Sequence, residues 1–126
     1  MTAARQSLGR GAEELVATSL RREGWELLER NARPAAVRGE IDIVALDRGA
    51  LVFVEVKAIR EGNLAGPEDP VLMVDPRKQA KLRSLAAAWI REGRSGAPGG
   101  VRFDVVGVTI AADGSVARWN HLEGAF

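Results

Sequence analysis

The chain has 126 residues, of which 46% are hydrophobic and 28% charged, a composition typical of a folded domain and not of a disordered segment. It has no cysteine, which excludes disulfide bonds, thiolate metal sites and cysteine nucleophiles. There is no apolar run of membrane-spanning length and no apolar core of a signal peptide, so we expect one cytoplasmic domain over residues 1–126 without membrane contact. The net charge of +1 requires any nucleic-acid-binding surface to be local.

The first predicted element is a helix over about residues 6–24, where apolar side chains recur at helical spacing and Gly24 is a stop signal. On this helix Glu13 lies at the margin of the apolar stripe, whereas Glu14 points away from it. We therefore expect Glu13 to reach a cleft beside the core and Glu14 to lie in solvent. The predicted stripe comprises Leu8, Ala12, Leu15, Val16, Ser19 and Leu20.

Residues 25–30 are predicted to form a short first strand, which a turn connects to the most informative stretch, residues 39–57. Two runs rich in β-branched residues flank Arg48 and Gly49 there, the pattern of a β-hairpin with a tight connection. A turn centred on these two residues pairs positions whose numbers sum to 97.

In this register Asp42 faces Glu55, and Glu40 faces Lys57. Directly opposed side chains share a face of the sheet, with Cβ atoms about 4.5–5.5 Å apart, so two carboxylates would repel each other unless a cation lies between them. Two carboxylates at the end of a buried face destabilise the fold when nothing compensates their charge, but a divalent metal ion would stabilise them. One face is predicted to carry Asp42, Val44, Leu46, Leu51, Phe53 and Glu55, and the other Ile41, Ile43, Val52, Val54 and Val56.

The second half of the chain alternates loops with regular elements. Residues 60–74 are predicted to be a loop because they contain several Gly and Pro residues, and Asp75 with Pro76 marks the start of a second helix that ends at Gly93. Its predicted buried stripe is Leu82, Leu85, Ala86, Trp89 and Ile90. A loop over residues 94–100 precedes strands over residues 101–110 and 116–119, separated by a turn at Asp113 and Gly114. This order of elements fits an α/β sandwich with a mixed sheet.

Asp42, followed after a dozen residues by Glu55-Val56-Lys57, resembles the PD-(D/E)XK motif of restriction endonucleases and archaeal Holliday-junction resolvases. More closely, the chain resembles the small bacterial YraN-like family, which is assigned to that fold by resemblance. The resemblance implies a restriction-endonuclease-like α/β/α sandwich with a central mixed sheet of about five strands. The matching segments span about residues 5–110 and are Gly9 to Ala17 with Glu13, Gly39 to Asp42, Phe53 to Lys57, Asp75 to Lys78 and Arg102 to Val106.

Asp42 and Glu55 are the predicted metal ligands, and hard carboxylate oxygens without cysteine or clustered histidine favour Mg²⁺ or Mn²⁺ over zinc. The resemblance adds the carbonyl of Val56 and the helix residue Glu13 as ligands, and it gives Lys57 a catalytic role beside the attacking water. A weak ion pair with Glu40 is the alternative for Lys57. Three roles stay open for Glu40: metal ligand, partner of Lys57, or cap of the site.

Lys78 is a candidate phosphate contact, although an ordinary snorkelling lysine would look the same in the sequence. Arg77 and Gln79 are weaker candidates of the same kind. Basic residues in the first turn of a helix oppose the helix dipole, which a bound phosphate would explain. We expect His121 to be structural, and we assign no role to Asp104.

These residues predict a Mg²⁺- or Mn²⁺-dependent endonuclease, or structure-specific nuclease, that hydrolyses phosphodiester bonds in DNA. One alternative is a catalytically inactive nucleic-acid-binding module of the same fold. Another is a protein-interaction adaptor whose tail, from Trp119 to Phe126, docks a partner. The resemblance to resolvases also implies a homodimer, for which the sequence offers only the apolar C-terminus as an interface.

Overall fold

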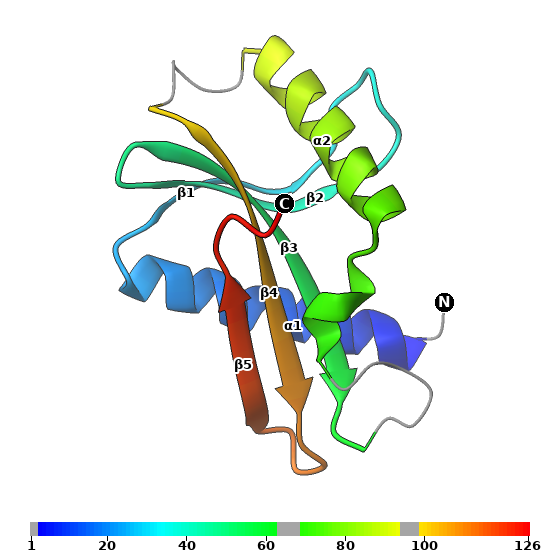
Figure 1. The fold of residues 1–126 in the computed structure, drawn as a ribbon. Coiled ribbons are helices and arrows are strands. Elements are labelled where there is room, and N and C mark those ends of the chain that lie inside the picture. Colours follow the sequence, from blue (N-terminus) through cyan, green and yellow to red (C-terminus); the bar gives the residue numbers. More distant parts are fainter. Residues whose placement is uncertain (1–2, 63–68, 94–98) are drawn as a thin grey trace.

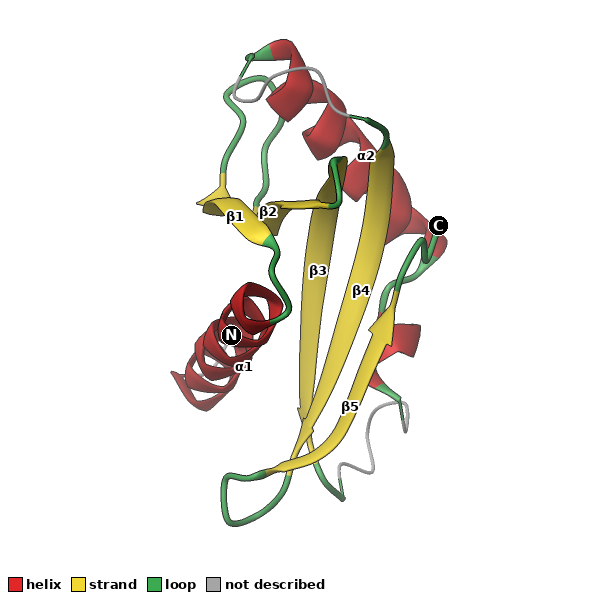
Figure 2. Ribbon diagram, turned by 90° about the vertical axis from the view of Figure 1, so that its left-hand side faces the viewer, coloured by secondary structure: helices red, strands yellow, loops and turns green. Residues whose placement is uncertain are grey.

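The computed structural model describes residues 3–62, 69–93 and 99–126, and it is an α/β/α sandwich (Figure 1). Figure 2 shows helix α1 on one face of the sheet and α2 on the other. The predicted restriction-endonuclease-like architecture is thereby confirmed. In chain order the elements are α1 (Ala3–Arg22), β1 (Glu26–Ala32), β2 (Ile41–Asp47), β3 (Ala50–Arg60), the short 3-10 helix η1 (Pro70–Met73), α2 (Pro76–Arg91), β4 (Val101–Ile110) and β5 (Val116–Leu122).

The five strands form one mixed sheet in the order β1-β2-β3-β4-β5. The central pair β3 and β4 is parallel, and the other three pairs are antiparallel. Parallel neighbours need a crossover connection, and the segment that contains η1 and α2 supplies it. The last strand extends to Leu122, three residues beyond its predicted end.

The hairpin of β2 and β3 has the predicted register, with Ile43 opposite Val54 and Asp47 opposite Ala50. Arg48 and Gly49 have φ values of 49° and 84°, as a two-residue turn with positive φ at both positions requires. The turn therefore matches the right-handed twist of the strands, and it fixes which side chains of the two strands lie opposite each other.

The predicted alternation of faces is wrong at the start of β2. Ile41 packs in the cluster beneath α2, whereas Ile43 packs beneath α1. At this point the Val56 N–H donates a hydrogen bond to the side-chain carboxylate of Asp42. Regular pairing of β2 with β3 runs only from Ile43 onward, so the two isoleucines need not share a face.

Two apolar layers hold the helices on the sheet. The layer beneath α1 includes Val16 and Leu20, and the layer beneath α2 includes Trp89, whose ring meets that of Phe53 edge-on at 5.7 Å. Two predicted stripe residues lie outside these layers, since Leu15 is 44% exposed and Ile90 is 41% exposed. Each helix turns a narrower face to the sheet than its apolar pattern predicts. Among the described ranges, no helix is both long and apolar enough to cross a membrane.

Part of the predicted loop over residues 60–74 is helical. Asp69 caps η1 by accepting the Val71 N–H at 3.1 Å. The 3-10 helix lies over Gly107 of β4, where a Cβ atom would come within 2.8 Å of Pro70 Cγ. A glycine at this position therefore allows η1 to approach the sheet closely and brings the start of α2 to the end of β3. Residues 63–68 and 94–98 of the predicted loops lie outside the described residues.

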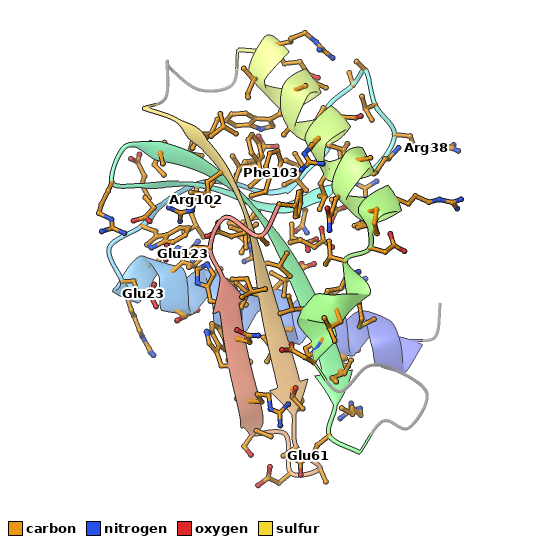
Figure 3. All side chains as sticks on the ribbon, viewed as in Figure 1. Glu23, Arg38, Glu61, Arg102, Phe103 and Glu123 are labelled. Carbon is orange, nitrogen blue, oxygen red and sulfur yellow. The ribbon has the colours of Figure 1, made fainter. Side chains whose placement is uncertain are left out.

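The C-terminal residues pack back onto the same chain. The Phe126 ring stacks on Phe103 at 5.0 Å, and the Arg83 guanidinium lies 5.2 Å from the Phe126 centroid. Figure 3 shows Phe103 between the sheet and α2. The end of the tail that was a candidate docking segment thus covers part of the core beneath α2.

Candidate metal centre

Asp42, the second residue of β2, is fixed by the neighbouring strand. Its Oδ2 atom accepts a hydrogen bond of 2.8 Å from the main-chain N–H of Val56. Burial, together with the negative charges of Glu55 and Glu13, raises the pKa of Asp42 to about 8 against the lowering effect of the hydrogen bond from the Val56 N–H. In the metal-free protein, Asp42 therefore keeps its proton around neutral pH.

Glu13, Glu40 and Asp42 bring their carboxylates together, although they come from α1, from the segment before β2 and from β2 itself. One oxygen of each lies within 4.8 Å of the others, and all three side chains are partly exposed. The predicted position of Glu13 at the edge of the helix stripe explains why it reaches this group. Glu14 instead points outward and pairs with Arg30 at 2.6 Å.

Glu55 of β3 is the most deeply buried acidic residue near this group, with 4% of its surface exposed. Its Oε1 atom lies 3.6 Å from the ammonium groups of both Lys57 and Lys78. Its Oε2 atom is buried and has no hydrogen-bond partner among the described residues. Burial raises the pKa of Glu55, and the two lysines act in the opposite direction. A buried carboxylate oxygen without a partner is costly, and a metal ion would satisfy it.

These residues suit a hard divalent cation. Carboxylate oxygens are the preferred ligands of Mg²⁺ and Mn²⁺, and the described residues near the group offer no histidine or sulfur ligand. The buried Glu55 Oε2 has no hydrogen-bond partner among the described residues, and the surroundings of Asp42 disfavour its ionised form, so a cation bound here would satisfy the first and stabilise the second. The donor set therefore fits the predicted metal.

Lys57 lies two residues after Glu55 on β3, and Lys78 reaches the same carboxylate from the first turn of α2. The ion pair of Lys57 with Glu40, considered as an alternative from the sequence, is not formed. Glu40 precedes β2 and pairs with Arg33 at 2.7 Å. The amino group of Lys57 therefore lies beside Glu55 and not beside Glu40.

The other two candidates on α2 lie differently. Gln79 donates to the Val74 carbonyl at 3.2 Å, which links the end of η1 to α2, and Arg77 is exposed. Asp75 caps the helix by accepting the Lys78 N–H at 2.9 Å. Of the three predicted nucleic-acid contacts, the structure therefore brings Lys78 to the acidic residues, leaves Arg77 facing solvent and uses Gln79 within the chain.

Two residues that the sequence did not single out contact the acidic group. Asn31 at the end of β1 donates from Nδ2 to Glu13 and to Glu40, and Arg33 pairs with Glu40. Both lie in a short segment without a clear periodic pattern. Their position beside Glu40 could have been found only by pairing β1 with β2, which the sequence does not specify.

A second acidic residue, Asp104 of β4, belongs to a separate and structural network. Arg102 donates to both of its oxygens at 2.8 and 3.0 Å, His121 Nε2 lies 2.8 Å from Oδ2, and the Gly124 N–H donates to Oδ1. Burial alone would raise the pKa of Asp104, but the hydrogen bonds from His121 and Arg102 hold it below its ordinary value. The network ties the C-terminal segment to the sheet, in agreement with the structural role expected for His121.

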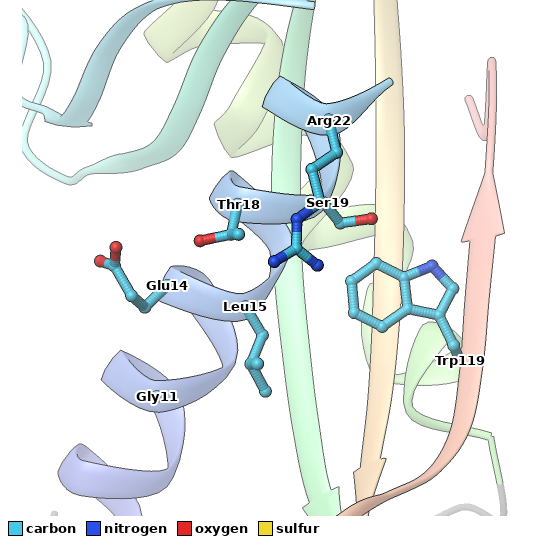
Figure 4. A pocket seen from close by; sticks show the side chains of 7 residues that line it. All are labelled: Gly11, Glu14, Leu15, Thr18, Ser19, Arg22 and Trp119. Carbon is cyan, nitrogen blue, oxygen red and sulfur yellow. The ribbon is translucent and has the colours of Figure 1, made fainter. Parts of the chain in front are cut away.

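Figure 4 shows a groove of about 510 Å³ between α1 and β5, away from the acidic group. Leu15 and Trp119 form its apolar part, and Trp119 is 37% exposed. Its lining residues are Gly11, Glu14, Leu15, Thr18, Ser19, Arg22 and Trp119. Because none of the clustered carboxylates lines it, the groove is not part of the candidate metal centre.

The α/β/α sandwich, with Asp42 on β2 and Glu55-Val56-Lys57 on the neighbouring β3, gives the chain the restriction-endonuclease-like architecture. Residues 12–108 match the model of the uncharacterised protein family UPF0102, and the chain belongs to this family. The YraN-like resemblance is thereby confirmed.

Three UPF0102 proteins illustrate the similarity. That of Streptomyces griseus is 46% identical over 112 residues, which cover 89% of this chain and 90% of the relative. That of Anaeromyxobacter dehalogenans is 41% identical over 122 residues, covering 97% and 85%. That of Pelotomaculum thermopropionicum is 39% identical over 127 residues, covering 100% of both chains. These names state no activity, so function has to be argued from the site.

Proposed function

We propose that this protein is a PD-(D/E)XK nuclease that uses Mg²⁺ or Mn²⁺ to hydrolyse phosphodiester bonds in DNA. The observation that carries the proposal is the buried carboxylate of Glu55 next to Asp42: one of its oxygens faces two lysines, and the other has no hydrogen-bond partner in the described part of the chain. A nuclease needs this combination, because negative ligands must hold a cation while a positive side chain remains beside the reacting phosphate.

In this proposal Asp42, Glu55, the Val56 carbonyl and Glu13 hold the metal ion. The bound ion supplies Lewis-acid chemistry, polarising the phosphodiester and lowering the pKa of water. With a cation bound, Asp42 would be ionised, and the repulsion between its carboxylate and that of Glu55 would be compensated. The hydrogen bond from Val56 N–H keeps Asp42 oriented in both states.

Lys57 acts on the water and on the charge of the transition state. Its ammonium group is a compact donor, held 3.6 Å from Glu55 Oε1. From there it orients the attacking water for the phosphorus atom and stabilises the negative charge that develops on the phosphoryl oxygens. A neighbouring carboxylate of the site would accept the proton of the attacking water.

Lys78 and Arg77 bind the phosphate backbone in this proposal, with Gln79 holding the start of α2 in place. The small net charge of the chain makes such a local basic patch necessary for binding DNA. We place this activity in the cytoplasm, where the nucleic acid is available. In a homodimer, two such sites would face two strands of a substrate.

A catalytically inactive binding module of the same fold is the main alternative. Ala58 and Ile59 follow Lys57, where the family usually has a more polar pair, and Ile59 is buried in the sheet. An adaptor role would have to use the groove beside Trp119, because Phe126 at the end of the tail is packed against Phe103.

Calorimetric titration with Mn²⁺ tests the proposal, with the wild type compared with Asp42→Asn and Glu55→Gln. Both substitutions keep the shape of the side chain and remove its charge. Each protein is then incubated with flap, junction and single-stranded DNA in the presence of Mn²⁺. We expect binding and cleavage by the wild type, and loss of both in the two variants.

Two results would contradict the nuclease proposal. A wild type that binds no Mn²⁺ with or without DNA would make the carboxylates structural, and the binding module would become the better description. Cleavage that persists in Glu55→Gln would point to a contaminating nuclease. Arg48→Gly, in the hairpin turn at the other end of the strands, serves as a control that should retain both properties.

A further inference from the structure

Asn31 occupies an unusual position beside the candidate metal centre. Its φ of 52° is left-handed, and among the residues described only Arg48, in the hairpin turn, shares a positive φ without being glycine. Asparagine tolerates this conformation better than most residues do. This left-handed residue lies at the point where β1 meets the acidic residues.

The strand register places Asn31 next to all three clustered carboxylates. Arg30 pairs with Ile43 and Ala32 pairs with Ile41, so the intervening Asn31 lies opposite Asp42. Its side-chain amide donates to Glu13 Oε2 at 3.2 Å and to Glu40 Oε1 at 2.8 Å. A primary amide has two hydrogens, so one group can serve both carboxylates.

The absence of charge on Asn31 is as important as its geometry. A lysine or arginine in the same place would hold two carboxylates through ion pairs, but its positive charge would compete with a divalent cation. A neutral amide holds them in place and leaves the negative charge of the group intact. Arg33, which also contacts Glu40, has a side chain that is 76% exposed, so solvent weakens its effect.

We propose that Asn31 is a positioning residue that holds Glu13 and Glu40 at the spacing needed to bind the metal ion together with Asp42. The inference rests on the proposed function, because it concerns the same metal ion. It also selects among the roles left open for Glu40, making it a ligand of the centre and not a partner of Lys57. Hydrogen bonds to the ligands of a metal ion commonly change its affinity 10- to 100-fold.

Asn31→Gly tests this role, since glycine keeps the left-handed backbone accessible and removes only the amide. The matched control is Arg48→Gly, which makes the same backbone change at the other positive-φ residue, in the hairpin turn. The unfolding free energy of each variant is measured in EDTA, and Mn²⁺ affinity is then measured by calorimetry. We expect Asn31→Gly to bind Mn²⁺ about 10-fold more weakly, or worse, and Arg48→Gly to bind it like the wild type.

A double-mutant cycle separates positioning from a general effect on the fold. If Asn31 acts through Glu13 and Glu40, then Asn31→Gly should have little further effect on Mn²⁺ affinity in a protein that already carries Glu13→Gln and Glu40→Gln. Equal fold-losses in both backgrounds would overturn the inference. So would an Asn31→Gly protein that binds Mn²⁺ normally, or one that loses affinity only because it is less folded in EDTA than Arg48→Gly.

The two proposals fail in different ways. A wild type that binds no Mn²⁺ overturns the proposed function and this inference together. A wild type that binds Mn²⁺, with an Asn31→Gly variant that binds equally well, overturns only the role of Asn31.

Discussion

Asp42 of β2 and Val56 of β3 are joined by a hydrogen bond of 2.8 Å from the Val56 N–H to Asp42 Oδ2. The bond connects the first acidic residue of the PD-(D/E)XK-like motif to the residue between Glu55 and Lys57. Both halves of the sequence motif are thus held together before any metal ion binds. An organised site of this kind loses less entropy on binding, but it keeps acidic groups close together in the metal-free protein.

The first prediction concerns the stability of the metal-free protein. The pKa of Asp42 is raised from an ordinary value near 4 to about 8, mainly by burial. The folded state therefore holds a proton that the unfolded state loses between these pH values. By linkage, the contribution of this proton to the free energy of unfolding is complete below about pH 4. It declines as the pH rises and is lost above about pH 8.

Asp42→Asn removes this titration. We expect it to be more stable than the wild type at pH 8 by at least about 1.4 kcal/mol, the equivalent of one pKa unit, with the difference vanishing towards pH 4. Denaturation in guanidinium chloride with EDTA at several pH values measures this. Subtracting the unfolding free energies of the two proteins cancels the contributions of the other titrating groups. A difference in unfolding free energy that does not change with pH would contradict the raised pKa of Asp42.

The second prediction is that metal binding releases protons. A ligand carboxylate must be ionised, so Mn²⁺ has to displace the proton that Asp42 keeps at neutral pH. Calorimetry at pH 7 in buffers of different ionisation enthalpy gives the number of protons released, which we expect to approach one and to fall as the pH is raised above about 8. Proton release that is absent at pH 7 would show that Asp42 is already ionised or is no ligand.

The third prediction separates the two lysines at Glu55. Lys57→Met should slow phosphodiester hydrolysis by about 10²- to 10³-fold, the usual range for loss of a group that stabilises charge in the transition state, without weakening Mn²⁺ binding. Lys78→Met should weaken DNA binding. It should also reduce the slope of the logarithm of the binding constant against the logarithm of the salt concentration by about one, the equivalent of one phosphate contact. Single-turnover cleavage and DNA titrations at several salt concentrations distinguish these effects. Identical phenotypes for the two variants would show that both lysines only neutralise Glu55.

The fourth prediction concerns Asp104, which is buried but lies outside the candidate centre. Asp104→Ala leaves the Arg102 guanidinium without its main partner and should destabilise the fold by about 3–5 kcal/mol, as for other broken buried ion pairs. The remaining folded protein should bind Mn²⁺ with unchanged affinity. Asp113→Ala is the control, because Asp113 is exposed and bonds only within its own turn to Ser115. Weaker metal binding by Asp104→Ala at full folding would contradict the separation of the two acidic groups.

The chain alone determined much of the central architecture, because these features depend on local spacing. The turn at Arg48 and Gly49 fixed the register of β2 with β3, and Asp75 with Pro76 fixed the start of α2. The period of two along each strand predicted most of the buried faces, although it failed at Ile41. The register also predicted that Asp42 lies near Glu55, although the regular pairing of the two strands begins only at Ile43 and Asp42 is instead bound by the Val56 N–H.

Tertiary structure decided which other groups meet these two carboxylates. Lys78 reaches Glu55 because η1 packs on Gly107 and brings the start of α2 to the sheet, and no periodic pattern encodes that approach. The contacts of Asn31 depend on the pairing of β1 with β2 and on a left-handed backbone at one residue. Hydrogen-bond periodicity and hydrophobic patterning determine elements and their faces. The rotation of a helix on the sheet, and the side chains that meet between elements distant in the chain, are set by packing of the whole molecule.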